Sequence, residues 1–107
     1  MFEWNSKIYM DEKVGKNPVK YKRMLEQKKL VKHCYVLTLP LNEKNCLDIY
    51  SSREFWFQYY HERQMEVVGL AVSMESAEEL LCRMAKDVYL KYGDVDAESM
   101  HRFFEVQ

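Results

Sequence analysis

Apolar residues run almost without a break through Val67–Val72 and then recur at helical spacing as far as Gly93. An apolar run of this length predicts a strand that is buried on both faces, and the spacing that follows predicts one long amphipathic helix. Ser76, with Glu79 three residues later, forms a capping-box signature at the helix start, and Ser73 is the alternative N-cap. Gly93 suits the left-handed residue that ends many helices. The segment therefore predicts a strand followed directly by the main helix of the fold.

Three other segments have the alternation or the composition of strands. Residues 31–40 are rich in aromatic and β-branched side chains and end at a proline, and residues 46–52 alternate between apolar and polar positions. We expect these two segments to pair as a hairpin across the polar residues 42–45. Lys7–Met10 predicts a short edge strand near the start of the chain. Gly69, inside the buried strand, indicates a β-bulge or the close approach of a helix.

Further helices are predicted in each half of the chain. Asn17 is a candidate N-cap with Pro18 at the first helical position, and apolar residues at helical spacing continue from there to about Leu30. Asp96 is a candidate N-cap for a short C-terminal helix. Residues 54–64 fit neither period cleanly, so a short helix or an irregular segment is expected there. The apolar residues of the C-terminal helix should dock onto the body of the domain: Met100, Phe103 and Phe104.

The order of these elements predicts an α+β fold in a single domain that covers residues 1–107. We expect a three- or four-stranded sheet with the two main helices on one face and a short C-terminal helix. A ferredoxin-like fold is one candidate for this order of elements. That fold hosts many unrelated activities, so the fold class alone leaves the function open.

The composition is that of a folded domain. The chain is 48% hydrophobic and 14% aromatic, has a formal net charge of -1, and contains three glycines and two prolines. Disordered chains are poor in aromatic residues and unbalanced in charge, so this composition is typical of a packed protein. No apolar stretch approaches the length of a signal peptide core or a membrane span. We therefore expect a cytoplasmic protein that does not contact a membrane.

Charge is divided unevenly between the two halves of the chain. Residues 1–53 contain 11 Lys+Arg and 6 Asp+Glu, whereas residues 54–107 contain 5 and 11, which gives balances of +5 and -6. The basic excess is concentrated between Lys13 and Lys32, where eight Lys and Arg residues face a single acidic residue, Glu26, and most of these cations lie on the helix predicted over residues 18–32. A solvated helix face, or attraction to the acidic half of the same chain or of a second copy, explains such a run. The alternative is a nucleic-acid contact. The candidate phosphate contacts are Lys20, Lys22, Arg23, Lys28 and Lys29.

The segment 55–60 holds five aromatic residues in six positions, and they cannot all face one core from a short element. Aromatic residues beside charges suit a protein interface, because they supply a large contact area at a small entropic cost. The alternative is that the segment covers an open end of the sheet as an outlying part of the core. The candidate interaction residues are Phe55, Trp56, Phe57, Tyr59 and Tyr60.

Residue types that act in catalysis or bind metals are scattered along the chain. The three histidines form no HxH or HxxxH pair, and Cys34, Cys46 and Cys82 are too widely spaced for a CxxC site. His33 and Cys34 are neighbours in a predicted strand, so their side chains point to opposite faces and cannot share one ion without a bulge. We therefore expect no metal site, no cofactor and no catalytic residue, and cysteines that are reduced and serve as packing residues.

Three functions from different classes are compatible with these features. The first is a non-enzymatic protein-interaction or regulatory module that self-associates, which the absence of a catalytic motif favours. The second is a nucleic-acid-binding accessory protein, with phosphates on the basic helix 18–32 and bases stacked on the aromatic segment 55–60. It requires both features on one face. The third is a small enzyme or ligand-binding protein whose pocket lies between the helices and the sheet.

Overall fold

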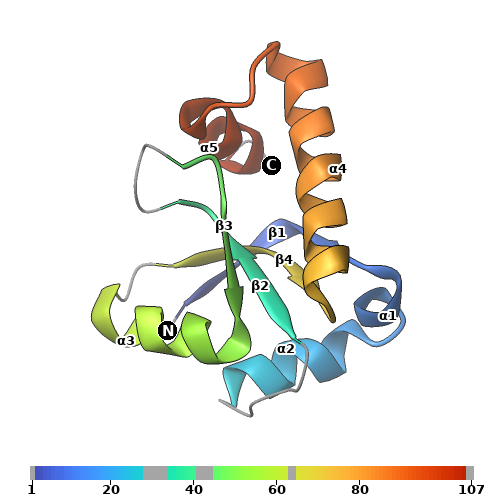
Figure 1. Ribbon diagram of the computed structural model, residues 1–107, viewed down its shortest axis with the longest axis vertical. Helices are drawn as coiled ribbons and strands as arrows, with labels where there is room; N and C mark the ends of the chain where they lie inside the picture. Colours follow the sequence, from blue (N-terminus) through green and yellow to red (C-terminus); the bar gives the residue numbers. More distant parts are fainter. Residues whose placement is uncertain (1, 28–33, 41–44, 63–64, 106–107) are drawn as a thin grey trace.

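A computed structural model of the chain describes residues 2–27, 34–40, 45–62 and 65–105, with residues 58–62 described by their backbone. These residues form four strands and five helices (Figure 1). In chain order they are β1 (Glu3–Met10), α1 (Glu12–Gly15), α2 (Pro18–Glu26), β2 (Tyr35–Thr38), β3 (Asp48–Ser51), α3 (Ser52–Glu62), β4 (Glu66–Ala71), α4 (Met74–Tyr92) and α5 (Ala97–Glu105).

The four strands form one mixed sheet in the order β1-β4-β2-β3. β1 runs parallel to β4, with Trp4 opposite Val67 and Met10 opposite Leu70. β4 pairs with β2, and β2 with β3, in antiparallel fashion. The β2–β3 pair is the hairpin predicted from the sequence, although residues 41–44 of its connection lie outside the described residues. β1 is the predicted edge strand, and it begins four residues earlier than expected, at Glu3 instead of Lys7.

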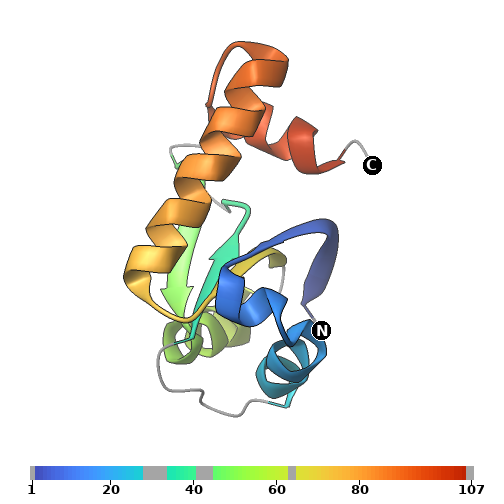
Figure 2. The ribbon, with the colours of Figure 1, turned by 90° about the vertical axis from the view of Figure 1, so that its right-hand side faces the viewer.

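Helices cover both faces of the sheet. On one face, Val36 and Val67 pack with α1, α2 and α3 in a first core, and on the other face Leu37 and Val68 pack with α4 and α5 in a second core. Figure 2 shows α4 on one side of the sheet and α1 with α2 on the other. The helices contribute Val14, Tyr21, Leu25 and Phe55 to the first core, and Ala77, Leu80, Met84, Val88, Met100 and Phe104 to the second.

The α+β class and the four-stranded sheet are confirmed, but the expectation that both main helices lie on one face is wrong. The physical reason is that β4 is apolar at positions that point in both directions, so each face needs its own cover. α2 covers one face with Tyr21 and Leu25, and α4 covers the other. β1 and β4 are direct parallel neighbours, so the pairings also do not give the split β-α-β arrangement of a ferredoxin-like fold.

Gly69 lies where β4, β2 and α4 approach most closely. A Cβ at this position would lie 2.9 Å from Met84 Cε and 3.2 Å from Leu37 Cβ. The register of β2 against β4 also shifts between Leu37 and Thr38. Both explanations that the sequence offered, a bulge and a close helix, therefore apply at this glycine.

A buried asparagine ties the C-terminal helix to the edge strand. Asn5 Nδ2 donates to the carbonyl oxygen of Phe104 at 2.9 Å and also to a carboxylate oxygen of Glu66. Asn5 Oδ1 accepts from the backbone N–H of Lys7 at 2.8 Å. A buried amide with its polar atoms bonded in this way avoids the cost of unsatisfied burial. α5 docks as predicted, with Met100 and Phe104 fully buried and Phe103 partly buried.

The ends of α4 follow local signals in the sequence. Ser73, not Ser76, is the N-cap, because the Ser73 hydroxyl oxygen accepts from the backbone N–H of Ser76 at 3.0 Å. The capping box predicted at Ser76 is therefore wrong, and the alternative is right. Gly93 ends the helix in the left-handed conformation with a φ of 76°, as predicted.

The remaining helices begin as the sequence indicated, with one difference in capping. Pro18 opens α2 after Asn17, but the Asn17 side chain makes no capping hydrogen bond. Asp96 Oδ1 accepts from the backbone N–H of Ser99 at 2.8 Å. Hydrogen bonds from the Ser99 side chain and from this N–H lower the pKa of the Asp96 carboxyl. Within the ambiguous segment 54–64, residues 54–62 form most of α3, an 11-residue helix, and residues 63–64 lie outside the described residues. Among the residues that the structure describes, no helix is both long and apolar enough to cross a membrane.

We predict that Gly69→Ala lowers the free energy of unfolding by about 1–3 kcal/mol, because the added methyl group overpacks the contact with Met84 and Leu37. Gly15→Ala is the matched control, since nothing lies within 4 Å of a Cβ at that position. The control should change the free energy by no more than about 1 kcal/mol, in the stabilising direction. Urea denaturation followed by circular dichroism measures both, and equal losses in the two variants would contradict the close approach.

Candidate functional site

The aromatic segment predicted as an interaction surface is divided between core and surface. Phe55 is fully buried, with its ring centre 4.9 Å from that of Phe2, so its assignment to an interaction surface is wrong. The first turn of α3 points this ring at the sheet. Trp56 is half-buried against the same core, whereas Phe57 is 63% exposed. Tyr59 and Tyr60 belong to α3, but their side chains lie outside the described residues.

The predicted phosphate contacts lie on α2 as far as the structure describes them. Lys20 and Arg23 are exposed, and Lys22 is half-buried. Lys22 Nζ lies 5.4 Å from the centre of the Trp4 ring, within the range of a cation–π contact. The other two candidates, Lys28 and Lys29, lie outside the described residues.

A series of aromatic contacts joins α2 to α3. Besides its contact with Lys22, Trp4 donates from Nε1 to Glu26 Oε2 at 3.1 Å. The ring centres of Trp4 and Phe2 are 5.2 Å apart, and those of Phe2 and Trp56 are 5.5 Å apart. These contacts bring the basic helix and the aromatic helix to one face of the sheet, at the lower end of the molecule in Figure 1. We call this surface the α2–α3 face and define it by Trp4, Lys20, Lys22, Arg23, Trp56 and Phe57.

Ion pairs do not neutralise the uneven charge of the two halves within the described ranges. The ion pair formed there joins Lys16 to Glu12, 3.5 Å apart within α1. The acidic excess of the second half is exposed on the first turns of α4, at Glu75, Glu78 and Glu79. Both the basic and the acidic surface are therefore available to a partner.

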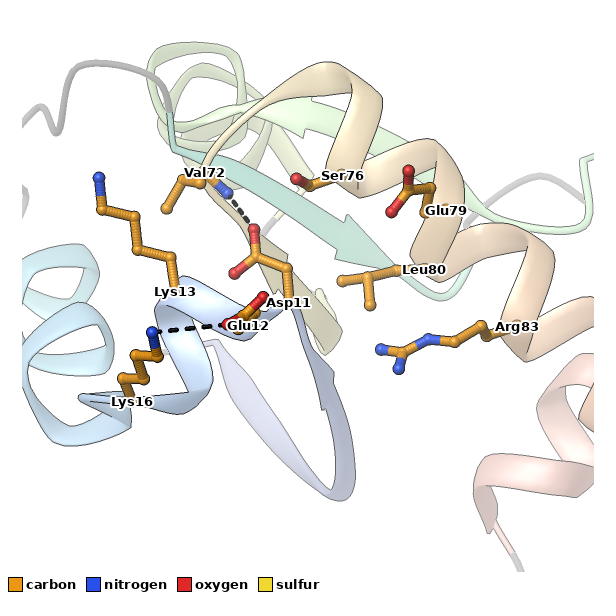
Figure 3. Close-up of a pocket in the computed structure, with 9 residues that line it drawn as sticks. All are labelled: Asp11, Glu12, Lys13, Lys16, Val72, Ser76, Glu79, Leu80 and Arg83. Carbon is orange, nitrogen blue, oxygen red and sulfur yellow. Dashed lines mark hydrogen bonds and ion pairs between the residues drawn. The ribbon is translucent and has the colours of Figure 1, made fainter.

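A groove opens where β1 and β4 end side by side. Its volume is about 620 Å³, and α1 forms one wall and α4 the other (Figure 3). β1 continues into α1 and α2 on one face of the sheet, and β4 continues into α4 on the other face. In open sheets, this divergence at the carboxyl ends of neighbouring strands leaves the crevice in which ligands bind.

Asp11 holds the two walls of the groove in place. Its Oδ1 accepts from the backbone N–H of Val14, and its Oδ2 accepts from the backbone N–H of Val72, both at 2.8 Å. Its own N–H donates to the carbonyl oxygen of Leu70 at 3.3 Å. One carboxylate thus caps α1 and joins the end of β1 to the end of β4. Asp11 is a positioning residue, because both of its carboxylate oxygens are bonded to the backbone.

The other polar side chains of the groove carry charges of both signs. Lys13 and Lys16 lie on the α1 wall, and Glu79 and Arg83 on the α4 wall (Figure 3). Arg83 Nη2 donates to the carbonyl oxygen of Met10 at 3.2 Å. The sequence did not predict this site. The one available signal was that a charged or polar residue follows each of two predicted strands, but nothing in the sequence indicated that these strands are neighbours.

Two hollows beside α5 share His101. Their volumes are about 510 Å³ and 270 Å³, and His101 Nε2 lies 3.3 Å from the carbonyl oxygen of Pro40. Among the described residues, no group of three His, Cys, Asp or Glu side chains is placed to hold a metal ion. The remaining titratable residues that line these hollows are carboxylates: Glu66, Asp96, Glu98 and Glu105.

Two titratable groups with raised pKa values, Tyr9 and Cys34, pack in or against the two cores. Burial raises the pKa of Tyr9, and so does the hydrogen bond that its hydroxyl donates to Asp87, which links β1 to α4. Burial, with a smaller contribution from the charge of Asp11, raises the pKa of the Cys34 thiol to about 11. Both shifts favour the protonated, unreactive form near neutral pH.

The chain matches no protein family, no curated protein and no solved structure.

We predict that Asp11→Ala lowers the free energy of unfolding by about 2–4 kcal/mol, because two backbone N–H groups lose a charged acceptor. Glu12→Ala removes a neighbouring carboxylate whose ion pair with Lys16 is exposed, so its effect should stay below about 1 kcal/mol. Chemical denaturation of both variants gives the comparison. If Asp11→Ala were no less stable than Glu12→Ala, the role of Asp11 in joining the walls would be excluded.

We expect thiol labelling to distinguish Cys34 from the other two cysteines. The expectation that all three cysteines are packing residues holds for Cys34, which is buried and has a pKa raised to about 11, but it is wrong for Cys46 and Cys82, which are exposed. The thiolate is the form that reacts with iodoacetamide. In the native protein at mildly alkaline pH, mass spectrometry should therefore find Cys46 and Cys82 alkylated first, and Cys34 only after urea is added. Native labelling of Cys34 at the rate of the exposed thiols would contradict its burial.

Proposed function

We propose that this protein is a non-enzymatic interaction module that binds a protein partner through the α2–α3 face. The observation that supports this is the contact series from Lys22 through Trp4 and Phe2 to Trp56, which joins a cationic helix to an aromatic one. Phe57, 63% exposed, extends the aromatic surface beyond that series. Tryptophan and arginine are among the residue types that contribute most to protein interfaces, and Trp4, Trp56 and Arg23 supply them on this face.

The charges of the α2–α3 face favour an acidic partner with an apolar patch. α2 carries Lys20, Lys22 and Arg23 against a single carboxylate, that of Glu26. Complementary charge speeds association and selects among partners, while burial of an aromatic side chain supplies most of the affinity. Phe57 is therefore the residue that we expect to be buried at the centre of the interface.

A second copy of the chain is one such partner. The first turns of α4 expose Glu75, Glu78 and Glu79, and no described cation forms an ion pair with them. A contact between the α2–α3 face of one copy and α4 of another joins two different surfaces, so it generates a ring or an open chain of subunits. This mode of self-association strengthens with protein concentration and weakens with salt.

Nucleic-acid binding is the second candidate, and one observation favours it. It requires the basic helix and the aromatic segment on one face, and the contact series that joins Lys22 to Trp56 on one face of the sheet supports this. Base stacking needs open ring faces, however, and the Trp56 ring is half-buried against Phe2 and Phe55. We therefore rank a protein partner first.

We place this module in the cytoplasm as part of the same proposal. Its three cysteines are free thiols, two of them exposed, and exposed thiols persist in reducing compartments.

The test combines partner identification with variants of the surface. One variant carries a photo-crosslinking amino acid at position 57, and a separate control variant carries it at position 90. Each variant is expressed in the host cell, and the crosslinked proteins are identified by mass spectrometry. Leu90 is a matched control because it is 72% exposed on α4, away from the α2–α3 face. We expect Phe57→Ser to weaken binding of the purified partner about 30-fold, which corresponds to the loss of an anchor worth about 2 kcal/mol.

Charge variants and salt distinguish the alternatives. Lys20→Glu/Arg23→Glu should slow association with a protein partner, while Lys86→Glu on the exposed side of α4 should have little effect. Sedimentation velocity over a range of concentrations detects self-association. Tight binding of labelled single-stranded RNA or DNA that falls steeply with salt would promote the second candidate. Equal losses from Phe57→Ser and Leu90→Ser would remove the α2–α3 face as the binding surface.

A further inference from the structure

We propose that the exposed side of α4 is the contact surface of a symmetric dimer, in which α4 pairs antiparallel with α4 of a second copy of this chain. We call this surface the outer face of α4 and define it by Glu75, Glu78, Glu79, Cys82, Lys86 and Tyr89. None of these residues belongs to the α2–α3 face, so the inference goes beyond the partner proposed for that face. It depends on the exposure of α4 and on the order of the charges along it.

The outer face is a continuous stripe on the side of α4 that points away from the core. Glu75, Cys82 and Tyr89 recur at intervals of seven residues, about two turns of a helix, so they lie in line along it. The other members flank this line, and all six are exposed. In Figure 1, α5 and the sheet lie to one side of α4. The side chains that α4 buries lie on that opposite side: Ala77, Leu80, Met84 and Val88.

Charge along the outer face changes sign near its middle. The second half carries Lys86, and the acidic Asp87 is turned toward β1, where it accepts a hydrogen bond from Tyr9. Within the described ranges, none of the six side chains of the outer face forms an ion pair or a hydrogen bond. The face therefore offers its charges to another molecule. The first half carries three carboxylates: Glu75, Glu78 and Glu79.

This order of charges is complementary to itself when two copies of α4 run in opposite directions. If the two helices cross at Cys82, the two-fold axis places residues before Cys82 beside residues after it on the second copy. Glu79, three residues before the crossing, then meets Lys86 of the second copy, four residues after it, and symmetry makes this contact twice. Tyr89 meets Glu75, whose carboxylate accepts from the tyrosine hydroxyl. A parallel pair would instead set the carboxylates against one another.

The length of the outer face indicates a small and reversible interface. From Glu75 to Tyr89 it spans about 21 Å, at 1.5 Å per residue. One pair of helices in contact over this length belongs with the small interfaces, below about 1,200 Å² in total. Tyr89, which is 58% exposed, contributes an aromatic ring at each end of the contact. The dimer therefore dissociates on dilution, and salt weakens it because its ion pairs lie at the surface.

The symmetric dimer differs from the contact between the α2–α3 face and α4 considered above. Both contacts use the carboxylates at the start of α4, so they exclude each other there. A contact between two different surfaces continues to a ring or an open chain, whereas pairing of α4 with itself closes at two copies. Lys20→Glu/Arg23→Glu changes the α2–α3 face alone, so the symmetric dimer should persist in this variant.

The experiment is sedimentation velocity of the full chain over a range of concentrations at low salt. We expect an equilibrium between monomer and dimer that goes no further. Lys86→Glu and Glu79→Lys should each weaken the dimer about tenfold, because each variant places like charges together at both symmetric contacts. Lys13→Glu, exposed on α1, is the matched control and should not weaken it. An equimolar mixture of the two α4 variants should restore the dimer, since every contact in the mixed pair again joins opposite charges.

Cys82 gives an independent measurement, because the two copies of it lie beside each other at the two-fold axis. Cys46→Ser leaves Cys82 as the exposed thiol, and a short bismaleimide should join two copies of this variant. Cys82→Ser leaves Cys46 exposed instead, and should give far less covalent dimer.

Four results would overturn the symmetric dimer. The chain could remain a monomer at every concentration, or it could associate beyond two copies. The mixture of Glu79→Lys and Lys86→Glu chains could fail to restore the dimer. Loss of the dimer in Lys20→Glu/Arg23→Glu would assign self-association to the α2–α3 face. A dimer that persists in that variant while the partner of the α2–α3 face is lost would show that the two surfaces act separately.

Discussion

Burial of β4 on both faces is the constraint on which the rest of this structure depends. Val67 and Leu70 pack into one core and Val68 and Ala71 into the other, so the strand has no face that water can reach. Such a strand needs helices on both sides. The helix that follows it, α4, covers one face, and the helices that precede it cover the other. The divergence of these connections from two parallel strands is also what opens the groove at their carboxyl ends.

Because both faces of β4 must be covered, the face toward α2 and α3 also needs its own packed core. α2 and α3 are far apart in the sequence. Aromatic residues near the N-terminal end of the chain pack between them, and Phe2 contacts both Phe55 and Trp56 of α3. Trp4 lies next in this series and contacts Lys22 and Glu26 of α2. Residues that complete a core therefore also fix the position of a basic helix on the surface. A surface supported in this way is more rigid than a row of lysines on an isolated helix, and rigidity lowers the entropic cost of binding.

Signals that depend on a few neighbouring residues were read correctly from the sequence. The buried strand, the long helix after it, the left-handed Gly93 and the cap at Asp96 are all of this kind. The sequence did not determine whether Ser73 or Ser76 is the N-cap of α4, because both are serines near the end of a strand. The extended backbone of Ser73 identifies it as the cap. The sequence left open whether Phe55 is exposed or buried, because five aromatic residues in six positions place an aromatic side chain on every side of a helix.

What the sequence could not provide was the neighbour of each strand. Alternation of apolar residues shows that a strand is buried, but it does not show which strand lies beside it, and β1 and β4 are separated by most of the chain. The groove is a product of that pairing, so its residues carried no signal. Asp11 illustrates the difficulty. The sequence predicted no role for it, but in the structure its carboxylate accepts hydrogen bonds from the backbone N–H groups of both Val14 and Val72.

Ion pairs among the described residues contribute little to the stability of this fold, although hydrogen bonds to charged groups such as Asp11 do contribute. The ion pair among the described residues, Lys16 with Glu12, has both side chains largely exposed and is worth roughly 0.3–0.5 kcal/mol. Among the described residues, the fully buried members of the two cores are apolar apart from Tyr21 and Cys34, and burial raises the pKa of the Cys34 thiol to about 11. A basic α2 and an acidic start of α4 are therefore not required by the fold. Substitution of Lys20 or Glu79 should therefore leave the fold unchanged, so binding measurements on such variants test the proposed surfaces without an effect of unfolding.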